Sequence, residues 1–134
     1  MLAGSLDTNI LVRLVTGDEE VQTQAVFRML ARHSKNHELL FVPITVVLEL
    51  EWVLRSRYGY PKEKLVGLLA DLLTTVELSF ESEDALEQAL ADYGEGKADF
   101  AEYLHLALSR KKGALPFFTF DRKAAKTKDV EVLV

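Results

Sequence analysis

The sequence predicts an α/β protein with a mainly parallel sheet. Short apolar runs with strand character alternate along the chain with longer segments of helical periodicity, and this order is typical of strands joined by helical crossovers. The chain has 134 residues, of which 49% are hydrophobic, so it is long enough for one domain with a substantial core. It has no internal repeat. We therefore expect a single domain over residues 1–134.

The first half of the chain contains two expected strands and four expected helices. In order, we expect a strand at 2–6, a brief helix from residue 9, a helix at 18–33, a strand at 39–42, a helix at 45–58 and a helix from 61 to 73. Pro43 closes the second strand. Gly59 interrupts the helical pattern, and Pro61 suits the first turn of the next helix.

The second half continues the alternation. We expect a strand at 76–80, a helix at 83–93, a loop at 94–97, a helix at 98–112, a strand at 117–120, a polar helical turn and a strand at 131–133. Gly113 is expected to end its helix as a left-handed cap. Ligands of parallel sheets lie outside the carboxyl ends of the strands. Asp7 and Asp121 each follow an expected strand, which makes that edge the place to look for a site.

Composition narrows the function classes. The chain has no cysteine, which excludes disulfides and thiolate metal sites, and no apolar run approaches the roughly 20 residues that cross a bilayer. The start of the chain lacks signal-peptide character, so we expect a cytoplasmic protein without membrane contact. The net charge of −5 argues against a protein that coats nucleic acid, but residues 98–134 hold seven basic and five acidic side chains. That segment is either a solvated surface or a contact for a polyanion.

Two polar clusters in the first half can each be explained with or without function. Asp7 is followed by two further polar residues, and all three types favour helix caps. Glu51 has Arg55 four residues later, which predicts a surface ion pair. Glu49 has no cation at helical spacing, so its carboxylate either extends into solvent or binds a metal ion or substrate group.

Three more acids follow the same logic. Asp99 and Glu102 share one helix face near a helix start, where capping is the alternative, and Asp121 can cap the turn that follows it. Several carboxylates at one sheet edge would repel by about 4 kcal/mol per close pair at an effective dielectric near 20. A cation removes this repulsion, and all-oxygen ligation selects Mg²⁺ or Mn²⁺.

Four segments in register, LDTNILVRL, VVLELEWVLRS, KADFAEYLHLAL and FFTFDRKAA, together resemble the PIN-domain ribonucleases, most closely the VapC-type toxins of bacterial toxin–antitoxin pairs. The resemblance implies a three-layer α/β/α domain with a parallel sheet of about five strands. It also implies acids that hold Mg²⁺ or Mn²⁺ and activate water for hydrolysis of RNA phosphodiester bonds. Typical partners of such toxins are a second copy of the chain and an antitoxin protein.

The resemblance also assigns residues to roles. Asp7, Glu49 and Asp121 match three acidic positions of the family. Asp99 and Glu102 match a position pair where the family commonly shows two aspartates, so Glu102 is a departure. The resemblance implies supporting polar roles for Thr8 and Asn9. We expect a similar supporting role for Thr119 and contacts with the RNA backbone for Arg13, Arg110 and Arg122.

Two other function classes compete with a ribonuclease. The first is a PIN-fold binding module with weak or absent turnover, and the Glu102 departure is the feature that favours it. The second is another magnesium-dependent α/β enzyme, such as a receiver domain or a haloacid-type phosphatase. Thr8 and Asn9 follow Asp7, where a phosphatase would carry a second aspartate. A trapped phosphoenzyme would distinguish that class.

Overall fold

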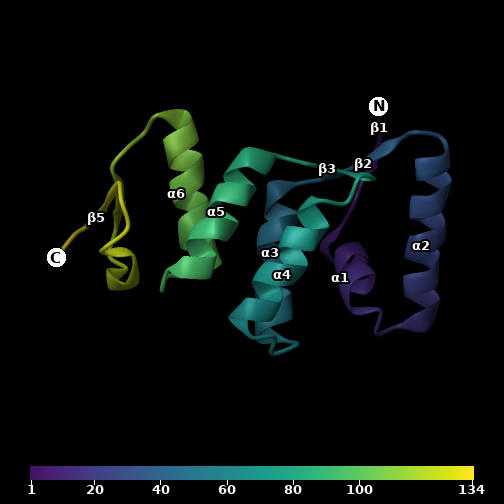
Figure 1. Cartoon of the computed structure of the whole chain (residues 1–134), viewed down its shortest axis with the longest axis horizontal. Coiled ribbons are helices and arrows are strands. Elements are labelled where there is room, and N and C mark those ends of the chain that lie inside the picture. The colour runs from purple at the N-terminus through teal and green to yellow at the C-terminus, as the bar shows by residue number, and fades with distance from the viewer. The chain divides into compact units, whose positions relative to one another are not determined.

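The computed structural model describes residues 1–134, and the chain divides into two units (Figure 1). Unit 1 comprises Met1–Glu81, and unit 2 comprises Ser82–Val134. Each unit has its own parallel strand pairing and its own buried apolar residues.

Unit 1 alternates strands and helices from its start. Its elements are β1 (Leu2–Ser5), α1 (Thr8–Thr16), α2 (Glu20–Lys35), β2 (Leu39–Val42), α3 (Ile44–Ser56), α4 (Lys62–Leu73) and β3 (Leu78–Phe80). The strand order is β1-β2-β3, with both pairs parallel. Leu40 faces Leu78 in the register of β2 and β3. Because parallel neighbours end at the same edge, the residues that follow β1 and β2 start from one side of this sheet.

Leucines form the core of unit 1. Leu11 of α1, Leu50 and Leu54 of α3 and Leu65 of α4 are fully buried. Burial of one such side chain stabilises the fold by about 1.5–3 kcal/mol relative to exposure. The apolar positions of α1 and α3 therefore fix the orientation of the polar residues on the opposite faces of these helices.

Unit 2 is built on a helix pair and a short strand pair. Its elements are α5 (Glu83–Glu95), α6 (Phe100–Lys112), β4 (Phe117–Thr119), the single 3-10 turn η1 (Arg122–Ala124) and β5 (Val130–Val132). The strands β4 and β5 are parallel. Tyr93 and Phe100 pack with ring centroids 5.6 Å apart, which joins α5 to α6.

The α/β prediction is confirmed, because all five strands pair in parallel and helices separate them. The strands form one sheet of three and one of two, each within its own unit. The 39–42 strand has the expected bounds, and Gly113 ends α6 with φ 73°, as expected for a left-handed cap.

Several element boundaries differ from the expected ones by one to a few residues. The helix expected from residue 18 starts at Glu20, because the Glu19 side chain caps it by accepting from Gln22 N at 2.6 Å. The expected 94–97 loop is partly helical, since α5 continues to Glu95. The third strand starts at Leu78 and not at residue 76. The helices are too short or too polar to cross a bilayer.

Candidate active site

Asp7 connects the first strand of unit 1 to the first helix. The N–H of Leu6 donates to the carbonyl of Phe41 at 2.9 Å, which holds the chain against β2 immediately before Asp7. The Asp7 carboxylate accepts from Thr8 N at 2.7 Å, so Asp7 caps α1. The expected capping role is therefore confirmed for one of the two carboxylate oxygens of Asp7. The side chain stays exposed, and that exposure leaves the carboxylate accessible for a ligand.

Thr8 connects Asp7 to the second acid of unit 1. Its side chain is 4% exposed, and its hydroxyl donates a short hydrogen bond to Oε1 of Glu49. Glu49 lies on α3, which follows β2 through Pro43, and its side chain is exposed. The two acids that follow neighbouring strands are thus linked through one residue, Thr8, whose backbone N–H binds Asp7 and whose hydroxyl binds Glu49. Asn9 is exposed in the first turn of α1.

The two glutamates of α3 have different environments. Glu51 is only 2% exposed, and Arg55 donates to it from Nε at 2.8 Å and from a terminal nitrogen at 3.4 Å. The expected ion pair is present, but its expected surface location is wrong for Glu51. Glu51 lies two residues from Glu49, which places it about 200° away around the helix. Glu49 is the α3 glutamate whose carboxylate faces solvent.

Unit 2 carries a similar pair of acids on either side of a threonine. The Thr119 hydroxyl donates to Oε2 of Glu102 at 3.4 Å, and it accepts from the backbone N–H of Asp121 at 3.0 Å. Asp121 in turn accepts from Lys123 N at 2.9 Å and so caps η1. Thr119 ends β4, so the end of this strand positions Asp121, and the Thr119 hydroxyl orients the carboxylate of Glu102, which lies on α6.

Asp99 occupies the N-cap position of α6 but does not use its side chain as a cap. Its backbone is extended, as caps require, and its side chain is exposed. The capping alternative therefore fails for the Asp99 side chain, whose carboxylate remains exposed at a helix start. The helix dipole favours an anion at such a position.

The donor set fits a hard divalent cation. The five candidate acids and the two threonines offer only oxygen atoms, which are the ligands that Mg²⁺ and Mn²⁺ prefer. Within either unit taken alone, no group of three or more His, Asp or Glu side chains could hold a metal ion. The histidines lie elsewhere: His33 contacts Glu38 at 2.9 Å, and the His105 ring packs 6.3 Å from that of Phe117.

The arginines expected to contact RNA differ in how they are held. Arg13 donates to Asp18 at 3.1 Å and to Gln22 at 2.6 Å. Arg110 donates to Asp129 at 3.1 Å and to Asp92 at 3.4 Å. Arg122 is exposed, and its guanidinium donates to the carbonyl of the final residue. Of the three, Arg122 is the one without an acidic partner.

A polar cluster beside α1 has no counterpart in the sequence-based expectations. The Tyr58 hydroxyl donates to Asp18 at 2.6 Å, and Thr16 donates to the other carboxylate oxygen at 2.8 Å. The Tyr58 and Thr16 hydrogen bonds, helped by the Arg13 charge, lower the pKa of Asp18. The hydrogen bond that Tyr58 donates to Asp18, together with desolvation, raises the pKa of Tyr58. Residue spacing gave no signal for this contact, because the partners are 40 positions apart.

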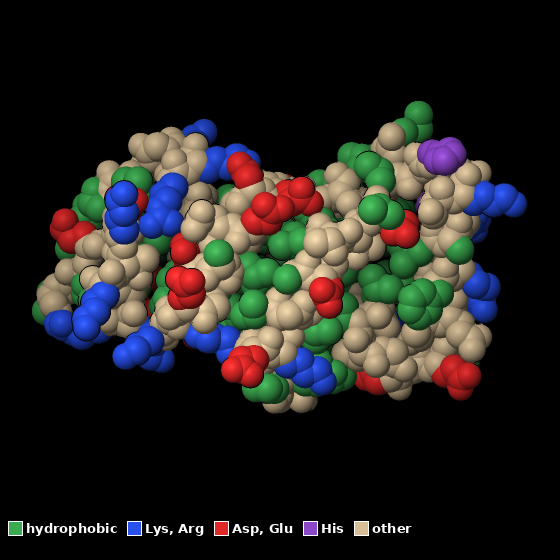
Figure 2. Space-filling view, viewed as in Figure 1, with side chains coloured by type: hydrophobic (Ala, Val, Ile, Leu, Met, Phe, Trp, Pro, Cys, Tyr) green, Lys and Arg blue, Asp and Glu red, His purple; other side chains and the backbone are tan.

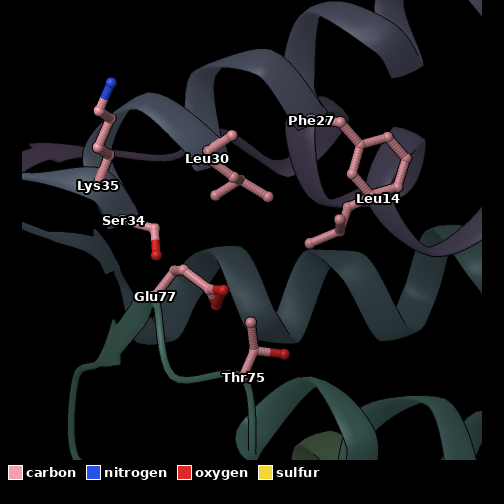
Figure 3. A pocket seen from close by; sticks show the side chains of 8 residues that line it. Leu14, Phe27, Leu30, Ser34, Lys35, Thr75 and Glu77 are labelled. Carbon is pink, nitrogen blue, oxygen red and sulfur yellow. The ribbon is translucent and has the colours of Figure 1, made fainter.

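Unit 1 also contains a cavity that is separate from the candidate acids. Figure 3 shows Leu14, Phe27 and Leu30 on one side of it and Thr75 and Glu77 on the other. Its volume is about 570 Å³. The lining is mainly apolar, so this cavity does not offer the oxygen-rich environment that a divalent cation requires.

Comparison with known proteins places the chain in a family. The family model for the PIN domain matches residues 5–130, so the chain belongs to the PIN domain family. This match confirms the family resemblance and the expected α/β/α fold class. Among curated proteins, the chain is 25% identical over 121 residues to a VapC ribonuclease of Aquifex aeolicus (strain VF5), covering 90% of this chain and 89% of that protein.

A solved structure is also similar. It is the crystal structure of VapC20 of Mycobacterium tuberculosis, described as a sarcin–ricin loop cleaving toxin. The match has a TM-score of 0.42 and 23% sequence identity, and it covers 92% of this chain and 95% of that one.

Proposed function

We propose that this protein is a metal-dependent endoribonuclease that hydrolyses RNA phosphodiester bonds as the toxin of a type II toxin–antitoxin system. The observation that carries the proposal is the arrangement of acids around a threonine in each unit of a PIN-family chain. Thr8 links Asp7 to Glu49, and Thr119 links Glu102 to Asp121. The similarity to a VapC ribonuclease supports the choice of RNA as substrate.

The proposed metal ligands are the carboxylates that the family resemblance assigns: Asp7, Glu49, Asp99, Glu102 and Asp121. When bound, Mg²⁺ or Mn²⁺ would supply Lewis-acid stabilisation of the charge that develops on the phosphate. The threonine hydroxyls hold the carboxylates in one orientation, as second-layer hydrogen bonds commonly do for metal ligands.

Proton transfer is the other task of the acids. The exposed Asp99 carboxylate accepts no helix N–H, so an Asp99 oxygen that does not bind the metal is available to accept a proton from the attacking water. Hydrolysis by water needs no covalent enzyme intermediate. The chain accordingly does not need a nucleophilic thiol, and it contains no cysteine.

The test is cleavage of a pool of structured RNAs by the purified protein with Mn²⁺ or Mg²⁺, and with EDTA. We expect cleavage that requires the metal and disappears in Asp7→Asn. The matched control is Asp71→Asn, which makes the same charge change at an exposed acid of α4. Cleavage that survives both EDTA and Asp7→Asn would reject the proposed chemistry.

The second candidate function is a PIN-fold binding module without turnover. The observation that favours it is Glu102 at a position where the resemblance implies aspartate. A folded protein that binds RNA or a protein partner but cleaves none of the pool, with either metal, would support this function. Cleavage restored by Glu102→Asp would identify the longer side chain as the cause.

We further propose that the two units form one PIN domain and that the protein acts in the cytoplasm as a homodimer, inhibited by an antitoxin. An acidic site favours a basic inhibitory segment by charge complementarity. Light scattering on the purified chain measures the dimer. Co-purification with the product of a neighbouring gene, and loss of RNA cleavage in that complex, would support the antitoxin.

A further inference from the structure

Unit 2 contains a cavity of about 400 Å³ whose rim is cationic. Two segments line it, the connection between α5 and α6 and the η1 turn with the residues after it. The charged residues of the lining are four cations and one acid: Lys97, Arg122, Lys123, Lys126 and Glu95. On the face shown in Figure 2, Lys and Arg side chains gather over the part that Figure 1 labels α6 and β5.

These cations differ from two other basic residues of unit 2, Arg110 and Lys111, which have acidic partners. Arg110 is neutralised by Asp92 and Asp129, and Lys111 donates to Asp84 at 2.9 Å. None of the four cations at the cavity forms an ion pair with an acid of the protein. Arg122 donates to the carbonyl oxygen of Val134, whereas no partner is seen for the ammonium groups of Lys97, Lys123 and Lys126. In a chain with a net charge of −5, such a group of cations around one cavity attracts an anionic ligand.

The floor of the cavity is rigid. Tyr103 is 3% exposed, and its hydroxyl accepts from Ala98 N at 3.2 Å. A Cβ added to Gly96 would lie 1.8 Å from that hydroxyl and 3.0 Å from the carbonyl of Asp92, so the backbone passes directly over the ring. The lysine and arginine side chains therefore surround a floor that is already ordered, so ligand binding does not cost the entropy of ordering it.

We propose that this cavity binds a phosphate of the RNA backbone next to the position of cleavage. The proposal rests on the ribonuclease function proposed above. The η1 turn carries Asp121, a proposed metal ligand, directly before Arg122 and Lys123, and the Asp121 carboxylate accepts from Lys123 N. This short turn thus places a proposed metal ligand next to cations that would bind the RNA backbone. Cations bind the backbone and position it, without reading its sequence.

The test is equilibrium binding of a fluorescently labelled single-stranded oligoribonucleotide, measured in EDTA so that no cleavage occurs. The double variant Lys123→Gln/Lys126→Gln removes two cavity cations. The matched control Lys112→Gln/Lys128→Gln removes two exposed cations of the same unit that do not line the cavity. For single strands, each phosphate contact contributes about 0.7 to the slope of log affinity against log salt. We expect the cavity variant to lower that slope by about 1.4 and the control to leave it unchanged.

Several results would overturn the inference. Equal loss of slope in both double variants would show a diffuse charge effect, and no loss in either would show that RNA binds elsewhere. Failure of the wild-type chain to bind RNA, or binding of a polyglutamate peptide at the cavity without an effect on RNA, would also reject it.

The cleavage assay separates this inference from the proposed function. With Mn²⁺, the cavity variant is expected to raise KM more than it lowers kcat, because its acids are intact. If the wild-type chain never cleaves but the salt slope behaves as expected, the ribonuclease proposal fails and the phosphate site stands. If the wild-type chain cleaves RNA and the salt slope of the cavity variant does not change, the ribonuclease proposal stands and the phosphate site fails.

Discussion

The hydroxyl of Thr8 donates a hydrogen bond to the carboxylate of Glu49, 41 positions further along the chain. Thr8 begins α1 and Glu49 lies in α3, so this bond joins the helices that follow β1 and β2. It also directs one carboxylate oxygen of Glu49 toward the hydroxyl and leaves the other for a ligand. The backbone N–H of the same threonine binds Asp7, so one residue positions two acids.

Thr8→Val is expected to lower metal affinity by about 10–100-fold, the usual cost of losing a hydrogen bond that orients a metal ligand. Valine has nearly the same shape, so the buried position stays filled. The measurement is Mn²⁺ titration by calorimetry, followed by RNA cleavage at saturating metal. Thr16→Val on the same helix is the control, since its hydroxyl bonds to Val12 and Asp18. Equal effects in both variants would mean that only helix stability had changed.

Glu102→Gln is expected to lower kcat by about 100-fold or more, because it removes a charge from the proposed metal ligands. Glu102→Asp keeps the charge and is expected to retain cleavage within about tenfold. Glu87→Gln, at an exposed position of α5, is the matched control. Steady-state kinetics on one RNA distinguishes the three variants. Full activity in Glu102→Gln would remove Glu102 from the proposed site.

Tyr58→Phe is expected to raise the pKa of Asp18 toward its ordinary value, since the Tyr58 hydroxyl is the largest cause of its lowering. A lowered carboxyl pKa stabilises the fold at neutral pH, and this contribution is lost as the pH falls through the folded-state pKa. In urea unfolding, the variant should therefore have a lower free energy of unfolding than the wild type at pH 7. This difference should shrink below the ordinary aspartate pKa. Tyr60→Phe is the control, and a pH-independent difference would contradict the assignment.

The raised pKa of Tyr58 predicts a second pH effect, at the alkaline end. A tyrosine whose folded-state pKa is raised stabilises the fold below its unfolded pKa, and this contribution disappears as the pH rises through the folded value. Ultraviolet titration of the phenolate band reports this directly. The Asp18→Asn variant should bring the Tyr58 transition back toward pH 10, the ordinary tyrosine pKa.

Arg110→Met is expected to destabilise the protein by about 1–3 kcal/mol, because Asp92, Asp129 and the carbonyl of Lys128 lose their donor together. Lys111→Met removes one exposed ion pair and should cost under about 1 kcal/mol. Thermal unfolding measures both. Unchanged stability with weaker RNA binding would restore the original expectation that Arg110 contacts the RNA backbone.

Gly96→Ala is expected to cost about 1–3 kcal/mol, as overpacking usually does, because the new Cβ overlaps the buried Tyr103 hydroxyl. Gly67→Ala is the matched control, since no atom other than the neighbouring backbone of α4 lies within 4 Å of its Cβ position. That change should be neutral or stabilise by about 0.5–1 kcal/mol. Chemical unfolding of both variants decides whether the backbone approach at Gly96 is as tight as the structure indicates.

Local patterns predicted the secondary-structure elements better than they predicted long-range contacts. The strand at 39–42 and the left-handed cap at Gly113 depend on residues close in sequence, and both are confirmed. The position of Asp7 after a strand is local in the same sense. Helical spacing also predicted the pair between Glu51 and Arg55, because the partners are one turn apart.

Burial and long-range hydrogen bonds were beyond local patterns. Spacing alone places Glu51 opposite Glu49 on α3 but does not say which face packs inward, so the buried member was assigned to the surface. The bond from Tyr58 to Asp18 joins a helix end to a loop 40 positions away. The contact of Thr119 with Glu102 depends on where β4 ends relative to α6. Such contacts follow from tertiary packing.

Asp7 starts a helix with the same carboxylate that is proposed to bind metal. Acids at active sites usually destabilise a fold. Asp7 instead stabilises it, since an N-cap acceptor contributes about 1 kcal/mol. Selection for a stable α1 and selection for activity therefore act on the same side chain. A chain that had lost its catalytic role would still favour Asp, Asn, Ser or Thr at residue 7 as a cap. A capping residue there does not by itself indicate hydrolysis, which requires the negative charge of the carboxylate.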